Sequence, residues 1–322
     1  MIYVFCHVGA KKPNGGVKIL FEYAQALIDT GYEAAILIPG AHLYPSDCPK
    51  NYKPDWFETS VPVYDDVRIV NSKDIVVMHE EGIWCFEHIA LYNPKFIMIN
   101  QGLQSSITDN VGMSISYSFA KRVYDSCLGV IAISPYIAEG VNKLFNVKKS
   151  NIHIIENPVD DFFKPGDKQN TILVMNKQPN NVVAKMILKI VSERYPEWEN
   201  KHINNMSLKQ VAEEMSRAKI FMFLSTPHGE GSSLPPIEAA LSGCSVVGYS
   251  GLGSRYYYKL PIFTEIEYND VTGFISVLDH QTELYKNSSV IFNKEIDELR
   301  SLRSKQFFTT RVGNVFWELL SG

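Results

Sequence analysis

The chain has 322 residues, of which 45% are hydrophobic and 20% charged, the balance of a folded globular protein with room for two domains of ordinary size. Its formal net charge of −4 argues against a nucleic-acid-binding protein, because such proteins usually carry a basic excess. No apolar run is long enough to span a bilayer, and no charged leader precedes a long apolar segment, so neither a transmembrane helix nor a signal peptide is expected.

The cysteines and the basic residues bear on where the protein works. The five cysteines are scattered and odd in number, and no C-x-x-C pair occurs, so reduced thiols in a cytoplasmic protein are expected. Short basic clusters lie at 11–12, 121–122 and 148–149. We interpret them as solvated surface, which leaves a peripheral contact with the inner membrane open.

Short apolar runs alternate with helical patterns along the chain. In the first half, strands are expected at 2–6, 34–38, 75–78, 96–99, 130–133 and 152–155, and helices at 16–30, 114–126 and 135–145. In the second half, strands are expected at 171–175, 220–224, 245–248 and 274–277, and helices at 181–194, 207–219 and 235–242. Apolar strands between helices are typical of parallel sheets covered on both faces, so an α/β fold with two doubly wound domains is predicted.

Composition also indicates where the domains meet. The stretch 157–166 is rich in Pro, Gly and Asp, which suits a linker. We therefore place an N-terminal domain at 1–160 and a C-terminal domain at 161–305. In the last segment, apolar residues recur at a spacing that suits one face of a helix, and residues 306–322 are expected to form a C-terminal helix.

The stretch 228–243, HGEGSSLPPIEAALSG, carries the strongest functional signal. It places Glu230 in a glycine turn after a buried strand and Glu238, with seven residues between them, on the first turns of a helix. Proline at a helix start and glycine at its end are usual boundaries, and the first backbone N–H groups have no partner inside the helix. The stretch therefore predicts a site for an anion or a sugar.

Each glutamate also has a plainer interpretation. A carboxylate early in a helix weakly stabilises the helix dipole, and this explains Glu238 as readily as a ligand does. Glu230 has no such structural role in a glycine turn, so a contact with a ligand is favoured there.

A second glycine turn follows the first predicted strand. Gly15 and Gly16 open a helix, where the backbone can approach a phosphate closely and unpaired amides favour negative charge. This is not a Walker A loop, because no G-K-[ST] follows the glycines. Taken alone, such a turn is more often plain turn chemistry than ligand binding.

Other polar residues stand at predicted strand ends, where doubly wound folds bind their ligands. His79 is interpreted either as a contact to acceptor or sugar or as a structural histidine. Lys177 follows the strand at 171–175 and is a candidate cation, whereas Lys185 is better explained as solvated surface. No D-x-D motif and no zinc spacing of His and Cys occur, so no metal site is expected.

A glycine turn also follows the strand at 245–248. Gly251 and Gly253 are secondary candidates for a ligand contact. The tyrosine run at 256–258 is interpreted as packing rather than base stacking.

These features resemble the GT-B glycosyltransferases of family 4, a large retaining group. The family pattern E-G-x-G-L-P-x-x-E-A is matched by residues 230–240, EGSSLPPIEAA, with Ser232 and Ser233 where the family commonly has an aromatic residue and a glycine. The family's G-G loop and G-[HY]-E sequence are matched by residues 15–16 and by residues 31–33, GYE.

Two further positions match the family in part. Ser134, before a proline, resembles its I-x-x-S turn. The family usually places an arginine and then a lysine near the first strand of the second domain to neutralise the donor diphosphate. Here Lys177 matches the arginine position loosely, and lysine lacks the bidentate fork of arginine.

The resemblance implies two Rossmann-like domains facing a cleft, with the terminal helix crossing back to the first domain. It implies a retaining, metal-independent hexosyltransferase that moves a sugar from a nucleotide-diphosphate donor to a glycan or lipid-linked acceptor, as in polysaccharide biosynthesis. The nucleotide sugar is then a substrate, and neither a cofactor nor a nucleic-acid partner is expected.

The resemblance also implies residue roles. Glu238 would accept hydrogen bonds from the donor ribose, and Glu230 would hold sugar hydroxyls or stabilise positive charge at the anomeric carbon. His79 is grouped with them as catalytic. The residues expected to bind the donor are Gly15, Gly16, Ser134, Lys177, Gly231, Ser232, Ser233 and Leu234.

Two other functions stay open. One is a nucleotide-sugar epimerase of the same fold. The other is a non-catalytic sugar-nucleotide or glycan-binding partner in a transferase complex, which the missing arginine favours.

Overall fold

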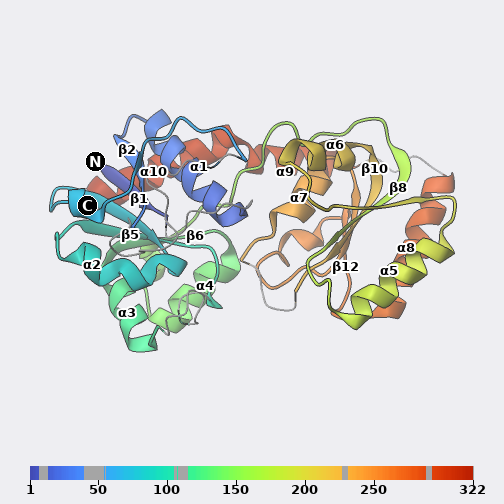
Figure 1. Cartoon of the computed structure of the whole chain (residues 1–322), viewed down its shortest axis with the longest axis horizontal. Helices are drawn as coiled ribbons and strands as arrows, with labels where there is room; N and C mark the ends of the chain where they lie inside the picture. Colours follow the sequence, from blue (N-terminus) through green and yellow to red (C-terminus); the bar gives the residue numbers. More distant parts are fainter. Residues whose placement is uncertain are drawn as a thin grey trace. The chain divides into compact units, whose positions relative to one another are not determined.

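The structure is a computed structural model, and it describes residues 1–6, 14–39, 54, 56–104, 107, 115–226, 231–287 and 292–321. The chain divides into two compact units (Figure 1). Unit 1 comprises Met1–Pro158 together with Lys305–Gly322, and unit 2 comprises Val159–Ser304. The chain therefore passes between the units twice.

Unit 1 is built on a parallel sheet. Within the described ranges the sheet has seven strands in the order β3-β2-β1-β4-β5-β6-β7. The strands are β1 (Ile2–Phe5), β2 (Ala34–Leu37), β3 (Val63–Tyr64), β4 (Ile75–His79), β5 (Lys95–Asn100), β6 (Cys127–Ala132) and β7 (Ile152–Ile154). The central strands are buried on both faces, which explains why they are continuous apolar runs in the sequence.

Helices cover both faces of this sheet. They are α1 (Gly15–Asp29), α2 (Phe86–Ala90), α3 (Tyr117–Asp125), α4 (Pro135–Phe145) and α10 (Lys305–Ser321), with short 3-10 turns η1 (Val67–Ile69), η2 (Glu80–Cys85) and η4 (Lys149–Asn151). α4 shows why helices form here: the Ser134 hydroxyl accepts the Ile137 N–H, Pro135 occupies the first turn, and left-handed Asn146 ends the helix.

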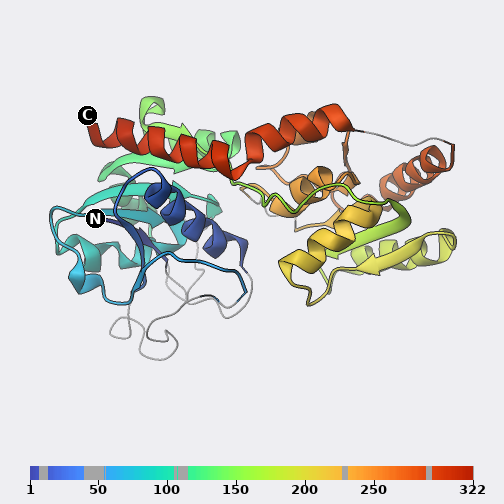
Figure 2. The ribbon, with the colours of Figure 1, turned by 90° about the horizontal axis from the view of Figure 1, so that it is seen from above.

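The C-terminal helix α10 belongs to unit 1 and packs against α1 (Figure 2). Its buried side chains are Phe308, Val312, Val315 and Phe316. The Phe308 ring lies 4.9 Å from that of Tyr23 on α1, and the Lys305 ammonium lies 3.1 Å from the Glu22 carboxylate. α10 thus completes the covering of one face of the sheet.

Unit 2 repeats this architecture on a smaller scale. Its described part holds a five-stranded parallel sheet in the order β12-β11-β10-β8-β9. The strands are β8 (Gln169–Asn176), β9 (Glu199–His202), β10 (Ala218–Leu224), β11 (Ser245–Gly248) and β12 (Phe263–Glu265). The helices are α5 (Val182–Arg194), α6 (Leu208–Arg217), α7 (Leu234–Leu241), α8 (Val271–Asn287) and α9 (Asn293–Arg303), with a 3-10 turn η5 (Tyr257–Lys259).

Side chains of β10 divide the core of unit 2 into two layers. Phe221 and Phe223 pack with α6, α7 and α9 on one face, and Ile220 and Met222 pack with α5 and α8 on the other. This alternation follows from the two-residue repeat of a strand. The described structure is therefore an α/β fold with two doubly wound domains.

The strand expected at 274–277 is wrong, because these residues lie within α8. Phe274 and Leu278, one helical turn apart, are buried, while Ser276 between them is exposed. A short apolar run does not distinguish a strand from a buried helix face, and here the helical repeat holds.

Strands β3, β9 and β12 were not expected from the sequence. β9 has the sequence ENKH and lies at a sheet edge next to β8. Its polar side chains carry no apolar signal, because an edge strand is only partly covered.

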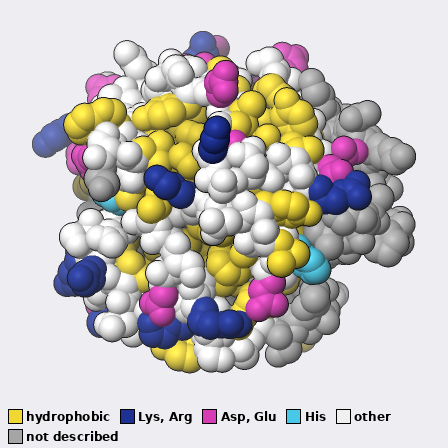
Figure 3. All heavy atoms as spheres, turned by 90° about the vertical axis from the view of Figure 1, so that its left-hand side faces the viewer, with side chains coloured by type: hydrophobic (Ala, Val, Ile, Leu, Met, Phe, Trp, Pro, Cys, Tyr) yellow, Lys and Arg dark blue, Asp and Glu magenta, His cyan; other side chains and the backbone are white. Residues whose placement is uncertain are grey.

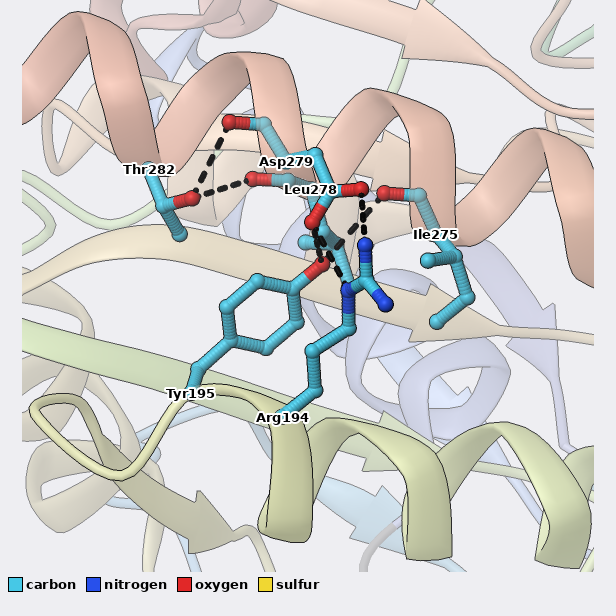
Figure 4. Close-up of polar contacts among 6 residues, drawn as sticks. All are labelled: Arg194, Tyr195, Ile275, Leu278, Asp279 and Thr282. Atoms are coloured by element: carbon cyan, nitrogen blue, oxygen red, sulfur yellow. Dashed lines mark hydrogen bonds and ion pairs between the residues drawn. The ribbon is translucent and has the colours of Figure 1, made fainter.

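A polar cluster joins α8 to the end of α5 (Figure 4). The Arg194 guanidinium lies 2.7 Å from the Asp279 carboxylate, and the Tyr195 hydroxyl donates to the same carboxylate at 2.8 Å. Together these contacts hold the carboxyl-terminal end of α5 against α8.

On the face seen in Figure 3, the described Lys and Arg side chains are distributed over several places among acidic and apolar side chains rather than gathered in one patch. Lys121 is paired with Asp125 at 2.7 Å, and Arg122 with Glu87 at 3.3 Å. The basic cluster at 121–122 therefore has the geometry of a solvated surface.

Candidate active site

In each unit there is a point in the sheet where the strand order reverses. In unit 2 the connection after β8 runs to β9 on one side, and the connection after β10 runs to β11 on the other. In unit 1 the connections after β1 and β4 diverge in the same way. Loops that leave neighbouring strands in opposite directions open a crevice at the carboxyl edge, where doubly wound folds bind ligands.

In unit 2, the described end of the predicted glycine turn is residue 231. β10 ends at Leu224, and residues 231–233 lead directly into α7. Glu230 and His228 lie outside the described residues. Gly231 is buried, and the Ser232 hydroxyl oxygen is buried without a hydrogen-bond partner in the described structure. A buried hydroxyl of this kind is usually satisfied by a ligand or water.

Ser233 is held from outside its own turn. Its N–H donates to the Ser254 hydroxyl at 2.9 Å, and its carbonyl accepts the Tyr257 hydroxyl at 2.9 Å. The sequence led us to expect this amide to bind the donor, but in the structure it is bonded within the protein.

Glu238 lies on α7 and is only 8% exposed. Leu234, half-buried, is the first residue of the helix, and Pro235 and Pro236 complete its opening. A largely buried carboxylate needs hydrogen-bond donors around it. In this position Glu238 is suited to accept hydrogen bonds from hydroxyl groups of a ligand.

Lys177 lies next to the end of β10. It follows β8, and its N–H donates to the Leu224 carbonyl at 2.9 Å. The side chain is exposed, and its ammonium lies 5.6 Å from the centre of the Phe223 ring. The next residue, Gln178, donates its side-chain amide to the Ser225 carbonyl. The cation thus lies near the end of β10, whereas Lys185 is exposed on α5.

In unit 1, Gly15 and Gly16 lie at the corresponding point, at the start of α1. Asn14 caps this helix, since its side-chain oxygen accepts the N–H of Gly16 at 2.9 Å and that of Val17 at 3.3 Å. A Cβ added to Gly16 would lie 3.3 Å from the Gln101 side-chain oxygen. A larger residue at this position would therefore require the Gln101 side chain to shift by a few tenths of an ångström.

His79 ends β4 on the other side of the unit 1 crevice. It is 3% exposed, and its ring lies 6.4 Å from that of Phe5 on β1. β4, which His79 ends, pairs with β1, the strand that precedes α1 in the chain.

Sequence reasoning missed Glu80 and Gln101 beside these residues. The Glu80 carboxylate accepts the Gln101 N–H at 2.9 Å, and the Gln101 side-chain amide donates to the Gly16 carbonyl at 3.3 Å. Burial raises the pKa of Glu80 to about 8. The Glu80-Glu81 pair was visible in the sequence, but nothing local indicated that one of the two is buried.

Ser134 lies apart from the unit 1 crevice. It follows β6, and β4 and β5 separate that strand from β1. Its hydroxyl caps α4. The tyrosines at 256–258 pack in the core, with Tyr257 and Tyr258 buried. Among the described residues, no group of three or more His, Cys, Asp or Glu side chains is placed to hold a metal ion. None of the described helices is both long and apolar enough for a membrane span.

Two doubly wound domains, each with ligand-binding loops at its switch point, define the GT-B class of fold. Solved structures share it across the whole chain. A glycosyltransferase from Rickettsia africae superposes with a TM-score of 0.68 at 14% identity, covering 100% of this chain and 98% of that one. HepE from Anabaena, solved in complex with UDP, gives a TM-score of 0.71 at 10% identity, covering 98% and 99%.

Sequence comparison identifies the family. No protein-family model matches the chain. An alpha-1,6-glucosyltransferase of Actinobacillus pleuropneumoniae serotype 7 (strain AP76) is 30% identical over 263 residues, which cover 78% of this chain and 73% of that protein. The chain belongs to the glycosyltransferases.

Proposed function

We propose that this glycosyltransferase moves a hexose from a nucleotide-diphosphate donor to a glycan or lipid-linked acceptor, with retention of configuration and without a metal ion. The observation that carries the proposal is the turn at 231–233, which opens α7 beside buried Glu238 at the switch point of unit 2. The UDP complex of HepE and the glucosyl activity named for the Actinobacillus relative support a nucleotide-hexose donor.

The proposed donor contacts come from the turn at 231–233 and from the first turns of α7. Glu238 would accept hydrogen bonds from the ribose hydroxyls, and the buried Ser232 hydroxyl would bond to the donor. The amides of Gly231 and Ser232 would donate to the sugar and diphosphate, whereas the Ser233 amide donates to the Ser254 hydroxyl. Glu230 keeps its proposed role at the sugar.

Lys177 is proposed as the cation for the reaction. When the bond between the anomeric carbon and the diphosphate oxygen breaks, negative charge builds on the leaving diphosphate. A fixed positive charge beside it lowers that barrier. The acceptor oxygen forms the new bond to the anomeric carbon, and its proton passes to the departing diphosphate oxygen. Both front-face attack and a covalent intermediate agree with this set of residues.

Unit 1 supplies the other proposed groups. Gly15 and Gly16 allow a phosphate to approach the start of α1, and His79 is proposed to contact the acceptor or the sugar. Action at a membrane surface and a role in polysaccharide biosynthesis in the cytoplasm belong to the same proposal.

The test is donor binding and transfer by Glu238→Ala and Lys177→Ala proteins. Loss of charge-assisted hydrogen bonds to the ribose should raise the donor KM of Glu238→Ala roughly 10- to 100-fold. Lys177→Ala should lower kcat, because its interaction strengthens in the transition state. UDP- and ADP-hexoses would serve as donors, with product followed by mass spectrometry.

Lys189→Ala is the matched control, since Lys189 is exposed on α5. It should leave both constants unchanged. The proposal would be abandoned if folded Glu238→Ala protein kept the wild-type KM and kcat. A changed sugar recovered from donor alone, without acceptor, would instead indicate an epimerase.

A further inference from the structure

The loop after β11 holds both backbone polar groups of Ser233. The Ser254 hydroxyl accepts the Ser233 N–H at 2.9 Å, and the Tyr257 hydroxyl donates to the Ser233 carbonyl at 2.9 Å. Ser254 is fully buried, and Tyr257 is 3% exposed. Water therefore does not compete for these two bonds, and they constrain the turn from one side.

Ser233 needs this external support because of its place in the fold. It is the N-cap residue of α7, and its own side chain makes no capping hydrogen bond. A helix start without a side-chain cap lacks one of its usual constraints. Here the neighbouring loop supplies the constraint, directly next to the turn that carries Gly231 and Ser232.

The Tyr257 ring is itself fixed. It lies 5.2 Å from the Phe263 ring and 5.1 Å from that of Tyr256, and the Arg303 guanidinium lies 5.9 Å from its centre. Arg303 is 2% exposed and donates to the Tyr256 hydroxyl at 2.6 Å. A hydroxyl on a ring held in this way loses little rotational freedom when it bonds to Ser233.

Arg303 also lies where the chain leaves unit 2. Its carbonyl accepts the Val159 N–H at 2.9 Å. Val159 and Ser304 are the first and last residues of the unit. The loop that holds Ser233 thus contacts Arg303 next to the last residue of the unit, and Arg303 is in turn bonded to the first residue.

We propose that Ser254 and Tyr257 are positioning residues for donor binding. They touch no substrate themselves; they hold the turn at 231–233 in the geometry that presents the Gly231 and Ser232 amides and the Ser232 hydroxyl. The inference rests on the proposed nucleotide-sugar function of this turn. If the turn is loosened, each donor-binding event must first order it. Binding of the donor is then weakened equally in the ground state and in the transition state.

The test uses Ser254→Ala and Tyr257→Phe in the full chain, with steady-state kinetics on UDP-hexose donors. Each substitution removes one hydrogen bond to Ser233 and should raise donor KM roughly threefold to tenfold with kcat nearly unchanged. Tyr195→Phe is the matched control. It also removes a buried tyrosine hydroxyl from unit 2, but at the end of α5 away from the carboxyl edge. It should lower the melting temperature and leave donor KM at the wild-type value.

Hydrogen–deuterium exchange without donor gives a second readout. The Ser233 amide should exchange slowly in wild type and in Tyr195→Phe, and faster in Ser254→Ala and Tyr257→Phe. Unchanged exchange, or unchanged KM in folded variants, would overturn the positioning role. Faster exchange in a protein whose wild type binds no nucleotide sugar would instead overturn the proposed function and, with it, the donor-positioning role.

Discussion

Among single residues, Glu80 departs far from the usual chemistry of its type. It is 4% exposed at the end of β4, and burial, with a smaller contribution from Glu81, raises its pKa from 4.5 to about 8. The backbone N–H of Gln101 opposes this shift but does not cancel it. At neutral pH the group is therefore largely protonated, and its link through Gln101 to Gly16 places this neutral carboxyl beside the start of α1.

This pKa predicts how stability depends on pH. Between about 4.5 and 8 the folded state holds the Glu80 proton and the unfolded state does not, so the stabilisation present below 4.5 is lost as pH rises through 8. Glu80→Gln, which stays neutral, should flatten this decline by roughly 2–4 kcal/mol. Urea unfolding from pH 4.5 to 9 measures it. Glu87→Gln, at an exposed site, is the control, and parallel profiles for Glu80→Gln and wild type would contradict the assignment.

At the level of elements, the close pairing of β10 with β11 leaves no room for a side chain at Gly248. Gly248 ends β11 opposite Phe223, and a Cβ at this position would lie 2.2 Å from the Phe223 carbonyl oxygen. The obstacle is backbone in a buried strand, which cannot move aside as a flexible side chain can. This close approach belongs to the pairing of β11 with β10, the strand that precedes the turn at 231–233.

Gly248→Ala should destabilise unit 2 by roughly 2–4 kcal/mol, because the two strands must separate to admit the methyl group. Gly15→Ala is the comparison for stability, since a Cβ there meets nothing within 4 Å. Its unfolding midpoint should match wild type or rise slightly. Equal melting temperatures for Gly248→Ala and wild type would show that β10 and β11 can be spread without cost.

At the scale of the whole molecule, the last helix is needed by the first unit. α10 lies after unit 2 in the sequence but buries Phe308, Val312, Val315 and Phe316 in unit 1. Unit 1 is therefore made of two segments far apart in the chain, and it is complete only when the last residues are present.

A chain ended at Ser304 should lose the stability of unit 1 while unit 2 stays folded. Phe316→Ala alone should cost roughly 3–5 kcal/mol. Trp317→Ala, one residue on, should change stability by less than about 0.5 kcal/mol, because that side chain is 66% exposed. Thermal melting and hydrogen exchange resolved by unit measure this. Intact protection of β1 and β4 in the shortened chain would refute the dependence.

Sequence by itself determined the α/β class, most strands and helices and the turn before α7. These depend on local sequence. Buried strands are continuous apolar runs, and helix starts are indicated by cap residues such as Ser134 and Asn181. The predicted strands placed His79 and Lys177 at strand ends, and the glycine pair placed Gly16 at a helix start. In the structure His79 ends β4, Lys177 follows β8 and Gly16 lies in the first turn of α1.

Only the tertiary structure decided the rest, because it depends on which segments meet. Burial of Glu80, the use of the Ser233 amide by Ser254, and the Arg303–Tyr256–Tyr257 cluster join residues far apart in the chain. The misassigned strand at 274–277 has the same origin, since neighbouring β11 and α5 determine which face of a short apolar run is covered. Local composition identifies the groups a site uses, and packing determines which of their bonds remain available to a ligand.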